Sequence, residues 1–306
     1  MVGLNSNKIF ERILAFDSKL NYERLFTNNK FKSEVYLISS IDFKEKYVYK
    51  IFSRGKIEYD LILDVILKLN NFNFLCPKLF YSKFDENKKK IHLIYEYIDC
   101  DEKFDISNDF HISNFILLLK NFYEITKFID GENRNQYFLS KIERIERKLG
   151  EDNLNGRIFE FIKKDLSNLM GVKGSMGVGG GVSVSLNRVI LRDINPTNIL
   201  ISKGKFYLID FDEISFGELE FDLADIYLNF SSGKNVSENL LFLNKIIFGL
   251  DLKDYDIISI KIIYYLILIL YHESLFIFES NSEKLSNLKK IKFFFENRVL
   301  LAEKLG

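Results

Sequence analysis

The sequence predicts an α+β chain with a small β-rich N-terminal lobe and a larger, mostly helical C-terminal lobe. Short β-rich runs concentrate between residues 33 and 98, and apolar residues at helical spacing dominate from Ser107 onward. Two short apolar strands, each ending in an aspartate, interrupt the helical part. We expect the lobes to span residues 1–97 and 98–306.

The first lobe is predicted to be a small sheet that carries one helix. Residues 8–26 look helical, and the runs "SEVYLISS" and "KYVYKIF" then read as strands. A helix follows in "IEYDLILDVILKLN", and after a turn at Pro77 the strands "PKLFYSKF" and "KKIHLIYEYI" complete the sheet. Apolar residues at helical spacing form one stripe on that helix: Leu61, Ile62, Val65, Ile66 and Leu69.

The second lobe is predicted to begin with three helices, in "HISNFILLLKNFYEITKFI", "NQYFLSKIERIERKLG" and "GRIFEFIKKDLSNLM". Strands in "RVILRD" and "KFYLIDF" follow, with "INPTNILIS" between them, and the rest is helical. The most apolar run, "IIYYLILILY", has ten residues, too few to span a bilayer, and predicts a buried core helix.

Composition excludes several classes of protein. The 306 residues are 47% hydrophobic and 28% charged, as in a globular protein. Because 43 basic residues balance 43 acidic ones, we expect no nucleic-acid or membrane partner. Cys76 and Cys100 form no metal or disulfide pattern, and the N-terminus lacks the features of a signal peptide. We expect a cytoplasmic protein, monomeric or homodimeric.

A glycine-rich tract, Gly171–Gly181, raises the question of a phosphate-binding loop. A P-loop needs Lys-Ser/Thr after its last glycine, and here Val182 follows. The dinucleotide fingerprint fails as well, because its third glycine position falls on Val182 or Val184. The tract is therefore interpreted as a flexible surface connector.

The strongest chemical signal lies just after this tract, in "LRDINPTNILISKGKFYLIDFDE". Two apolar strands end in Asp193 and Asp210, and Asn198 comes five residues after the first aspartate. Carboxylate and amide oxygens are ligands that Mg²⁺ prefers. Phosphoryl transfer needs such a metal together with a group that orients the acceptor hydroxyl.

These motifs resemble the aminoglycoside phosphotransferase and choline kinase superfamily, which has a protein-kinase-like fold. "RDINPTN" is similar to its catalytic loop, "YLIDFDE" to its metal-binding strand end, and "FDLADIY" to the Tyr-Asp-Leu-Ala motif that follows. The chain departs from the family at Leu191, where a histidine that orders the loop is usual.

The resemblance implies a role for each matching residue. Asp193 would orient the acceptor hydroxyl and accept its proton, while Asn198 and Asp210 would hold Mg²⁺ on the phosphates of ATP or GTP. Asp222 would accept hydrogen bonds from the catalytic-loop backbone. Asp212 is left open between a contact to metal or substrate and a plain exposed carboxylate.

A kinase-like lobe also needs a strand lysine on the phosphates and a glutamate that holds it. Lys50 in "YVYKIF" fits, or is a solvated lysine at a strand edge. Glu58 falls in the apolar stripe of the predicted helix, which predicts an ion pair with Lys50. It is otherwise an exposed first-turn residue favoured by the helix dipole.

Two further sites follow from the resemblance, and a third follows from His272 and Glu273, which interrupt the apolar helix near Tyr264, Tyr265 and Tyr271. The backbone from Glu96 to Ile98 would hydrogen-bond adenine. Ser33, in a glycine-free loop, would meet the phosphates or form a plain turn. The tyrosines near His272 and Glu273 would cage a cationic amine, or pack as ordinary core.

We therefore expect an ATP- and Mg²⁺-dependent kinase of a small-molecule hydroxyl. The resemblance implies an aminoglycoside-type antibiotic, hence antibiotic resistance, or an amino alcohol such as choline, or a sugar-like metabolite. The alternative is a catalytically silent kinase-like binding protein, motivated by Leu191 and the glycine-free loop.

Overall fold

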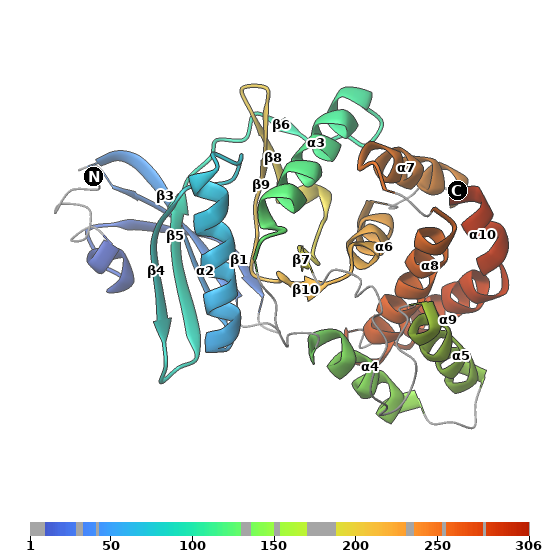
Figure 1. Ribbon diagram of the computed structural model, residues 1–306. Helices are drawn as coiled ribbons and strands as arrows, with labels where there is room; N and C mark the ends of the chain where they lie inside the picture. Colours follow the sequence, from blue (N-terminus) through green and yellow to red (C-terminus); the bar gives the residue numbers. More distant parts are fainter. Residues whose placement is uncertain are drawn as a thin grey trace. The chain divides into compact units, whose positions relative to one another are not determined.

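The computed structural model of the chain divides into two compact units, drawn in Figure 1. It describes residues 10–28, 33–40, 43–129, 136–149, 154–169, 188–230, 236–252, 255–277 and 280–305. The glycine-rich tract lies outside these residues, so its interpretation as a connector stays a prediction.

The boundary between the units differs from the predicted one at Tyr97. The first unit runs to Phe104 and also takes in residues 197–212, and the second comprises residues 105–196 and 213–306. The cause is a short strand after the expected hinge, β6 (Glu102–Lys103), which pairs with a strand inside residues 197–212.

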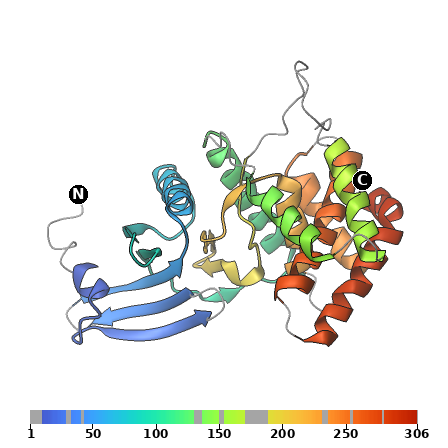
Figure 2. The same ribbon diagram turned by 90° about the horizontal axis from the view of Figure 1, so that it is seen from below.

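The first unit is built on a five-stranded antiparallel sheet in the order β1-β2-β3-β5-β4. Its strands are β1 (Asn21–Asn28), β2 (Ser33–Ser40), β3 (Phe43–Ser53), β4 (Leu79–Asp85) and β5 (Lys90–Glu96). Helix α2 (Lys56–Asn71) lies along one face (Figure 2). There the Tyr59 hydroxyl donates to Ser82 Oγ at 3.1 Å and its ring stacks on Phe84. The predicted apolar stripe of α2 is buried throughout, which confirms the helix and its orientation.

The N-terminal segment corrects the predicted helix over residues 8–26. Within the described part of this segment, residues 10–14 are helical, and the chain from Asn21 to Asn28 is strand β1. The reason is aromatic packing: the Tyr22 ring lies 5.0 Å from Phe16 and 6.5 Å from Tyr36 of β2, centroid to centroid. Cross-strand aromatic pairs of this kind stabilise a sheet edge.

A second small sheet in the first unit has the strand order β6-β8-β9. Strands β8 (Ile199–Ser202) and β9 (Lys205–Leu208) form a hairpin, and β8 had not been predicted as a strand. Lys203 and Gly204 form its turn with φ of 51° and 72°. Two left-handed residues are typical of the turns that close two-residue hairpins.

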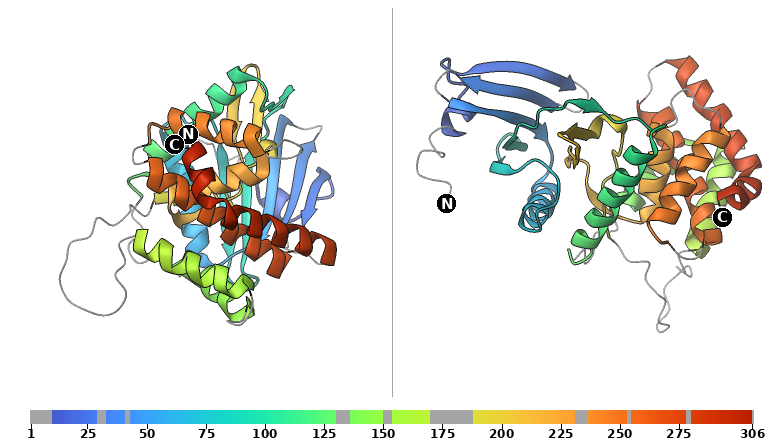
Figure 3. Two further views of the ribbon diagram at one scale, coloured as in Figure 1. Left: turned by 90° about the vertical axis from the view of Figure 1, so that its right-hand side faces the viewer. Right: turned by 90° about the horizontal axis from the view of Figure 1, so that it is seen from above.

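The second unit is mostly helical. Its elements are α3 (Asp109–Thr126), α4 (Gln136–Leu149), α5 (Leu154–Leu169), β7 (Arg188–Ile190), β10 (Ser215–Gly217), α6 (Leu219–Phe230), α7 (Val236–Gly249), α8 (Tyr255–His272), the π-helical turn η2 (Glu273–Ile277), α9 (Asn281–Glu296) and α10 (Arg298–Leu305). Helix α8 is central, in contact with α4, α5, α6, α9 and α10 (Figure 3).

Helix α8 has the character predicted for the most apolar run. Together with η2 it is the one helix, within the described residues, that is long and apolar enough to cross a membrane by length and composition alone. Most of its residues are buried inside the helical unit. This burial agrees with the predicted core helix.

Candidate active site

The backbone of the predicted catalytic loop, in the second unit, is held by a buried carboxylate on α6. Asp222, fully buried, accepts hydrogen bonds from the amides of Leu191 and Arg192 and from the Tyr123 hydroxyl, each at 2.8 Å. The predicted structural role of Asp222 is confirmed. The loop is thus anchored through its amides even though Leu191 replaces the usual histidine.

Two more residues on the same face of α6 complete the anchor. Asp225 accepts from the Ile194 amide at 3.0 Å, and Asn229 donates to the Ile194 carbonyl at 3.0 Å. With Asp222 they occupy positions i, i+3 and i+7, which share one side of a helix. The sequence interpretation missed Asp225 and Asn229, although this spacing in "FDLADIYLN" was the available signal.

Burial dominates the electrostatics of this anchor. Desolvation raises the pKa of Asp222 to about 6, against the opposing hydrogen bonds from Leu191, Arg192 and Tyr123. Burial, and then the neighbouring charge of Asp222, raise the pKa of Asp225 well above its ordinary value. The carboxylates are therefore held here for the geometry of the loop and at some cost in stability.

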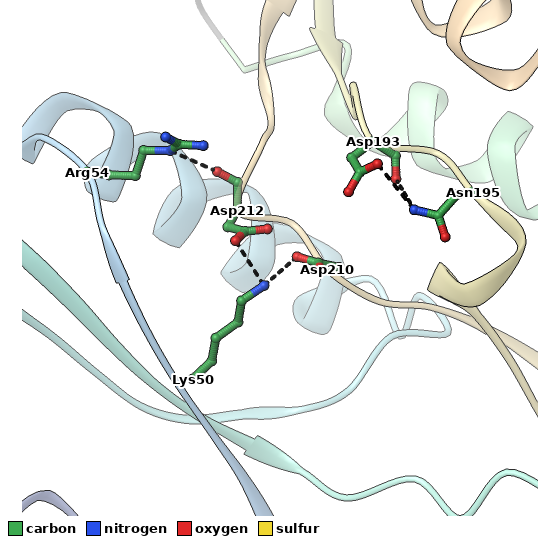
Figure 4. A network of polar contacts seen from close by, with 6 residues as sticks. All are labelled: Lys50, Arg54, Asp193, Asn195, Asp210 and Asp212. Atoms are coloured by element: carbon green, nitrogen blue, oxygen red, sulfur yellow. Dashed lines mark hydrogen bonds and ion pairs between the residues drawn. The ribbon is translucent and has the colours of Figure 1, made fainter. Parts of the chain in front are cut away.

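Asp193 follows β7 and is exposed, which leaves its carboxylate accessible to a substrate. The Asn195 side-chain amide donates to its Oδ1 at 3.2 Å (Figure 4). The preceding residue, Arg192, has a left-handed backbone with φ of 69°, and its guanidinium donates to the Glu213 carbonyl at 3.2 Å. Strained backbone conformations of this kind concentrate at functional sites.

In the first unit, the β8–β9 hairpin brings Asn198 and Asp210 to one end. Asn198 immediately precedes β8, Asp210 lies just after β9, and the Ile209 amide donates to the Asn198 carbonyl at 3.0 Å. Asp210 is also left-handed, with φ of 69°. One amide and one carboxylate, both oxygen donors beside each other in the fold, fit a Mg²⁺ ion that takes its remaining ligands from phosphates and water.

Lys50 extends from β3 to two carboxylates of the same unit (Figure 4). Its ammonium lies 2.5 Å from Asp210 Oδ1 and 2.9 Å from Asp212 Oδ2, and the residue is 8% exposed. This contact excludes the alternative of a solvated strand-edge lysine, and it shows that Asp212 is more than a plain exposed carboxylate.

The three charges of this cluster perturb one another. Burial alone would lower the pKa of Lys50, but Asp210 and Asp212 outweigh it and raise the pKa. Burial raises the pKa of Asp210, whereas for Asp212 the ammonium and the hydrogen bond from Asp210 overcome burial and lower the pKa. Two carboxyls that share one ammonium titrate as a pair, one below and one above the ordinary range.

The predicted ion pair between Lys50 and Glu58 is wrong. Glu58 is exposed in the first turn of α2, and its side chain folds back over Gly55 at the helix start. Helical periodicity placed Glu58 on the buried stripe, but the stripe is covered only from Tyr59 onward. The alternative, an exposed first-turn carboxylate at the positive end of the helix dipole, is what the structure has.

The predicted adenine-contacting segment ends β5. The Glu96 amide donates to the Lys78 carbonyl at 2.9 Å, so it is already engaged. The Ile98 amide has no hydrogen-bond partner among the described residues. Ser33, buried, is the first residue of β2 and pairs with Asn28, and the loop between them lies outside the described residues.

The suggested tyrosine cage on α8 is wrong. Tyr264, Tyr265 and Tyr271 are all buried, and their hydroxyls bond to Asp165, Glu218 and the Asn155 carbonyl at 2.5, 2.6 and 3.1 Å. They pack as ordinary core. Over the part of the chain that the structure describes, no three His, Cys, Asp or Glu side chains form a metal-binding group.

Comparisons with known proteins give the fold. No protein-family model matches the sequence, and no curated protein matches it. Among solved structures, the chain is similar to an amicoumacin kinase, hAmiN, in complex with AMP-PNP, Ca²⁺ and Ami (TM-score 0.68, 13% identity, 95% of this chain and 96% of that one).

Two further solved structures agree. The chain is similar to choline kinase LicA from Streptococcus pneumoniae (TM-score 0.62, 15% identity, 96% of this chain and 99% of that one). It is also similar to a thermostable mutant of aminoglycoside phosphotransferase APH(4)-Ia in ternary complex with ADP and hygromycin B (TM-score 0.55, 11% identity, 96% and 97%). The chain therefore has the protein-kinase-like fold of these phosphotransferases, as the sequence motifs predicted.

Proposed function

We propose that the protein is a phosphotransferase that moves the γ-phosphoryl group of ATP or GTP to a hydroxyl of a small molecule. The observation that carries this proposal is the contact between Lys50 and Asp210, 2.5 Å apart at the end of the β8–β9 hairpin. It joins the predicted phosphate-binding group to the predicted metal ligand. The fold supports it, since the three similar proteins are kinases or phosphotransferases by name.

The residues take separate roles in the proposed reaction. Lys50 contacts the phosphates, and Asn198 and Asp210 hold Mg²⁺, which when bound neutralises charge on the phosphates. Asp193 accepts the proton of the acceptor hydroxyl as its oxygen bonds to the γ-phosphorus. The bond from that phosphorus to the leaving nucleoside diphosphate breaks, and the diphosphate carries the electron pair away.

Adenine recognition is proposed for the backbone from Glu96 to Ile98, where the Ile98 amide is available as a donor. We propose a cytoplasmic site of action, because both Cys76 and Cys100 are free thiols. The acceptor classes are an aminoglycoside-type antibiotic, an amino alcohol such as choline, or a sugar-like metabolite. The similar structures that contain amicoumacin-type and hygromycin B ligands support a small-molecule acceptor.

A second candidate function is nucleotide binding without turnover. The observation in its favour is that the Lys50 ammonium engages both Asp210 and Asp212, so a bound metal would have to displace it from Asp210. Titration with ATP in the presence of Mg²⁺ tests binding, and a coupled assay for nucleoside diphosphate release tests turnover.

The decisive experiment is a phosphoryl-transfer screen over aminoglycosides, amino alcohols and sugars with three variants. We expect Asp193→Asn to lose at least a hundredfold in kcat and to keep its affinity for ATP. Lys50→Met should lose affinity for ATP at least tenfold. Asp256→Asn, at an exposed position on α8, is the matched control and should change neither. Unchanged turnover in Asp193→Asn would refute the catalytic assignment.

A further inference from the structure

Two cations and a histidine ring lie against one aromatic ring just after α8. The Arg144 guanidinium carbon lies 4.7 Å from the centroid of the Phe276 ring, and Lys148 Nζ lies 5.2 Å from the same centroid. The His272 ring centroid is also 5.2 Å from that of Phe276. We call these four residues the basic cluster.

Stability of α4 does not explain this arrangement. Arg144 and Lys148 are like charges at i, i+4 on one exposed helix face, an arrangement that destabilises a helix. Within the described residues neither cation pairs with a carboxylate. By contrast, Glu146 on the same helix pairs with Lys163 of α5 at 2.6 Å. The cation–π contacts with Phe276 offset this repulsion in part, but they supply no negative charge, so both cations stay available to an anion.

The backbone that carries Phe276 is itself unusual. Phe276 belongs to the π-helical turn η2, and single π-helical turns occur frequently at functional sites. Three carboxylates of the same unit are engaged with other partners. Glu273 accepts from Asn287 at 3.0 Å, and Glu218 and Glu220 pair with Lys261 of α8 at 3.0 and 3.3 Å. Among the residues that the structure describes, no carboxylate pairs in this way with Arg144 or Lys148.

The basic cluster is connected to the catalytic loop through secondary structure of the same unit. Helix α4 lies against α8 and against β10. Strand β10 pairs with β7, with Phe216 opposite Val189, and β7 runs directly into the loop that carries Asp193. A ligand bound to α4 would therefore lie on the helix that packs against β10. Strand β10 in turn pairs with β7, which leads to Asp193, the proposed catalytic base.

From these contacts we infer that the acceptor carries an anionic group, a carboxylate or a phosphate, bound by Arg144 and Lys148. This inference rests on the proposed phosphotransferase function. The planar guanidinium matches either anion through paired hydrogen bonds, and the lysine adds a point charge. An anion between the two cations relieves their mutual repulsion. The exposed part of the Phe276 ring suits the carbon skeleton of the ligand.

The inference reverses the charge expected of a polycationic antibiotic. An acceptor with several ammonium groups would be repelled by the basic cluster, and repulsion of the wrong ligand is a common source of specificity. An anionic or zwitterionic hydroxyl compound would be attracted. The property to measure is therefore the preference of the protein among ligands that share one carbon skeleton and differ in charge.

The test uses four acceptors with the same sugar ring: glucose, glucuronate, glucose 1-phosphate and glucosamine. Binding is followed by two-dimensional ¹H–¹⁵N NMR of the full chain at constant ionic strength. We expect the Arg144 Nε–H signal and the amides of Lys148 and Phe276 to shift with at least one anion and not with glucosamine. The glucuronate and glucose 1-phosphate arms distinguish a carboxylate from a phosphate ligand.

The double variant Arg144→Gln with Lys148→Gln should abolish those shifts, because glutamine keeps the helix propensity and removes the charge. The matched control is Arg157→Gln with Lys164→Gln, which removes the same charge from exposed positions of α5 and should leave the shifts intact. Shifts that are absent in the unaltered protein, or unchanged in the double variant, overturn the inference.

Turnover separates this inference from the proposed function. Where an anionic sugar is phosphorylated, the double variant should raise its KM at least tenfold with little change in kcat. Phosphorylation of glucosamine in preference to both anions would overturn the inference and uphold the kinase. Localised anion shifts without turnover of any acceptor, together with failure to bind ATP, would uphold the anion site and refute the kinase.

Discussion

Replacement of Asp222 by asparagine should remove a pH dependence of stability and leave stability at neutral pH nearly unchanged. Burial holds the pKa of Asp222 at about 6, against an ordinary value of 3.8. Between these pH values the folded protein retains a proton that the unfolded chain has lost. The free energy of unfolding contributed by this group therefore falls as pH rises from about 4 to about 6.

The magnitude follows from the shift. A difference of about two pKa units, at 1.36 kcal/mol each, makes the ionised carboxyl cost about 3 kcal/mol at neutral pH. Asp222→Asn removes that cost. It also leaves one backbone amide of Leu191 or Arg192 facing a side-chain NH₂ group instead of an oxygen, a loss of about 1–3 kcal/mol. The two effects nearly cancel at pH 7, and only the pH dependence remains.

The assay is urea unfolding of the wild type, Asp222→Asn and the exposed control Asp256→Asn, at several pH values from 4.5 to 7.5. We expect the wild type and the control to lose about 2 kcal/mol more than Asp222→Asn over this range, by the same linkage, because part of the titration of the unfolded chain lies below pH 4.5. Phosphoryl transfer should fall at least tenfold in Asp222→Asn, because the loop amides lose an acceptor. Equal pH slopes in all three proteins would refute the account of a buried, ionised anchor.

Three further predictions concern single substitutions, two in the second unit and one in the first. Tyr123→Phe removes the 2.8 Å hydrogen bond to Asp222 and should cost about 1 kcal/mol in unfolding free energy, while the pKa of Asp222, followed by NMR, rises further because the bond favours the carboxylate. Gly217→Ala should cost about 1–3 kcal/mol, since its Cβ would lie 2.5 Å from Ile190 Cδ1 in a buried strand pair. Gly204→Ala meets no atom within 4 Å, and its cost of about 1 kcal/mol would come only from its left-handed backbone.

In the first unit, the periodicity of apolar residues predicted the elements whose apolar side chains repeat at helical or strand spacing. The stripe from Leu61 to Leu69 gave α2 its buried face, and the β-rich runs gave β2 to β5. Strand β1 was missed because "NYERLFTN" reads as either element in isolation. Its strand state depends on packing of Tyr22 against Phe16 and Tyr36, residues that local spacing does not bring together.

In the candidate site, too, some features could be predicted from local sequence spacing, and others depend on contacts formed only in the folded chain. The spacing of Asp193, Asn198 and Asp210 was readable, and so was the anchoring role of Asp222. Their catalytic roles stay a prediction. The partner of Lys50 was not readable, since Asp210 lies 160 residues away and a nearer carboxylate, Glu58, had suitable helical phase. The position of a residue on one side of a helix does not predict whether the sheet covers the first turn of that helix.

The joint between α8 and α6 gives the last prediction. The Lys261 ammonium, in a residue 5% exposed, lies 3.0 Å from Glu218 Oε2 and 3.3 Å from Glu220 Oε1, and the Tyr265 hydroxyl donates to Glu218 at 2.6 Å. Lys261→Met leaves these carboxylates without a counter-charge and should cost about 3–5 kcal/mol in urea unfolding.

Adding Glu218→Gln to Lys261→Met should recover part of that loss, because it removes one of the uncompensated charges. A cost below about 1 kcal/mol for Lys261→Met would contradict the charge-pairing argument. Glu218 directly precedes α6, and α6 holds the proposed catalytic loop through Asp222, Asp225 and Asn229. Loosening of this contact should therefore also lower the proposed phosphoryl transfer. A variant that loses stability and keeps full activity would show that α6 positions the loop without help from α8.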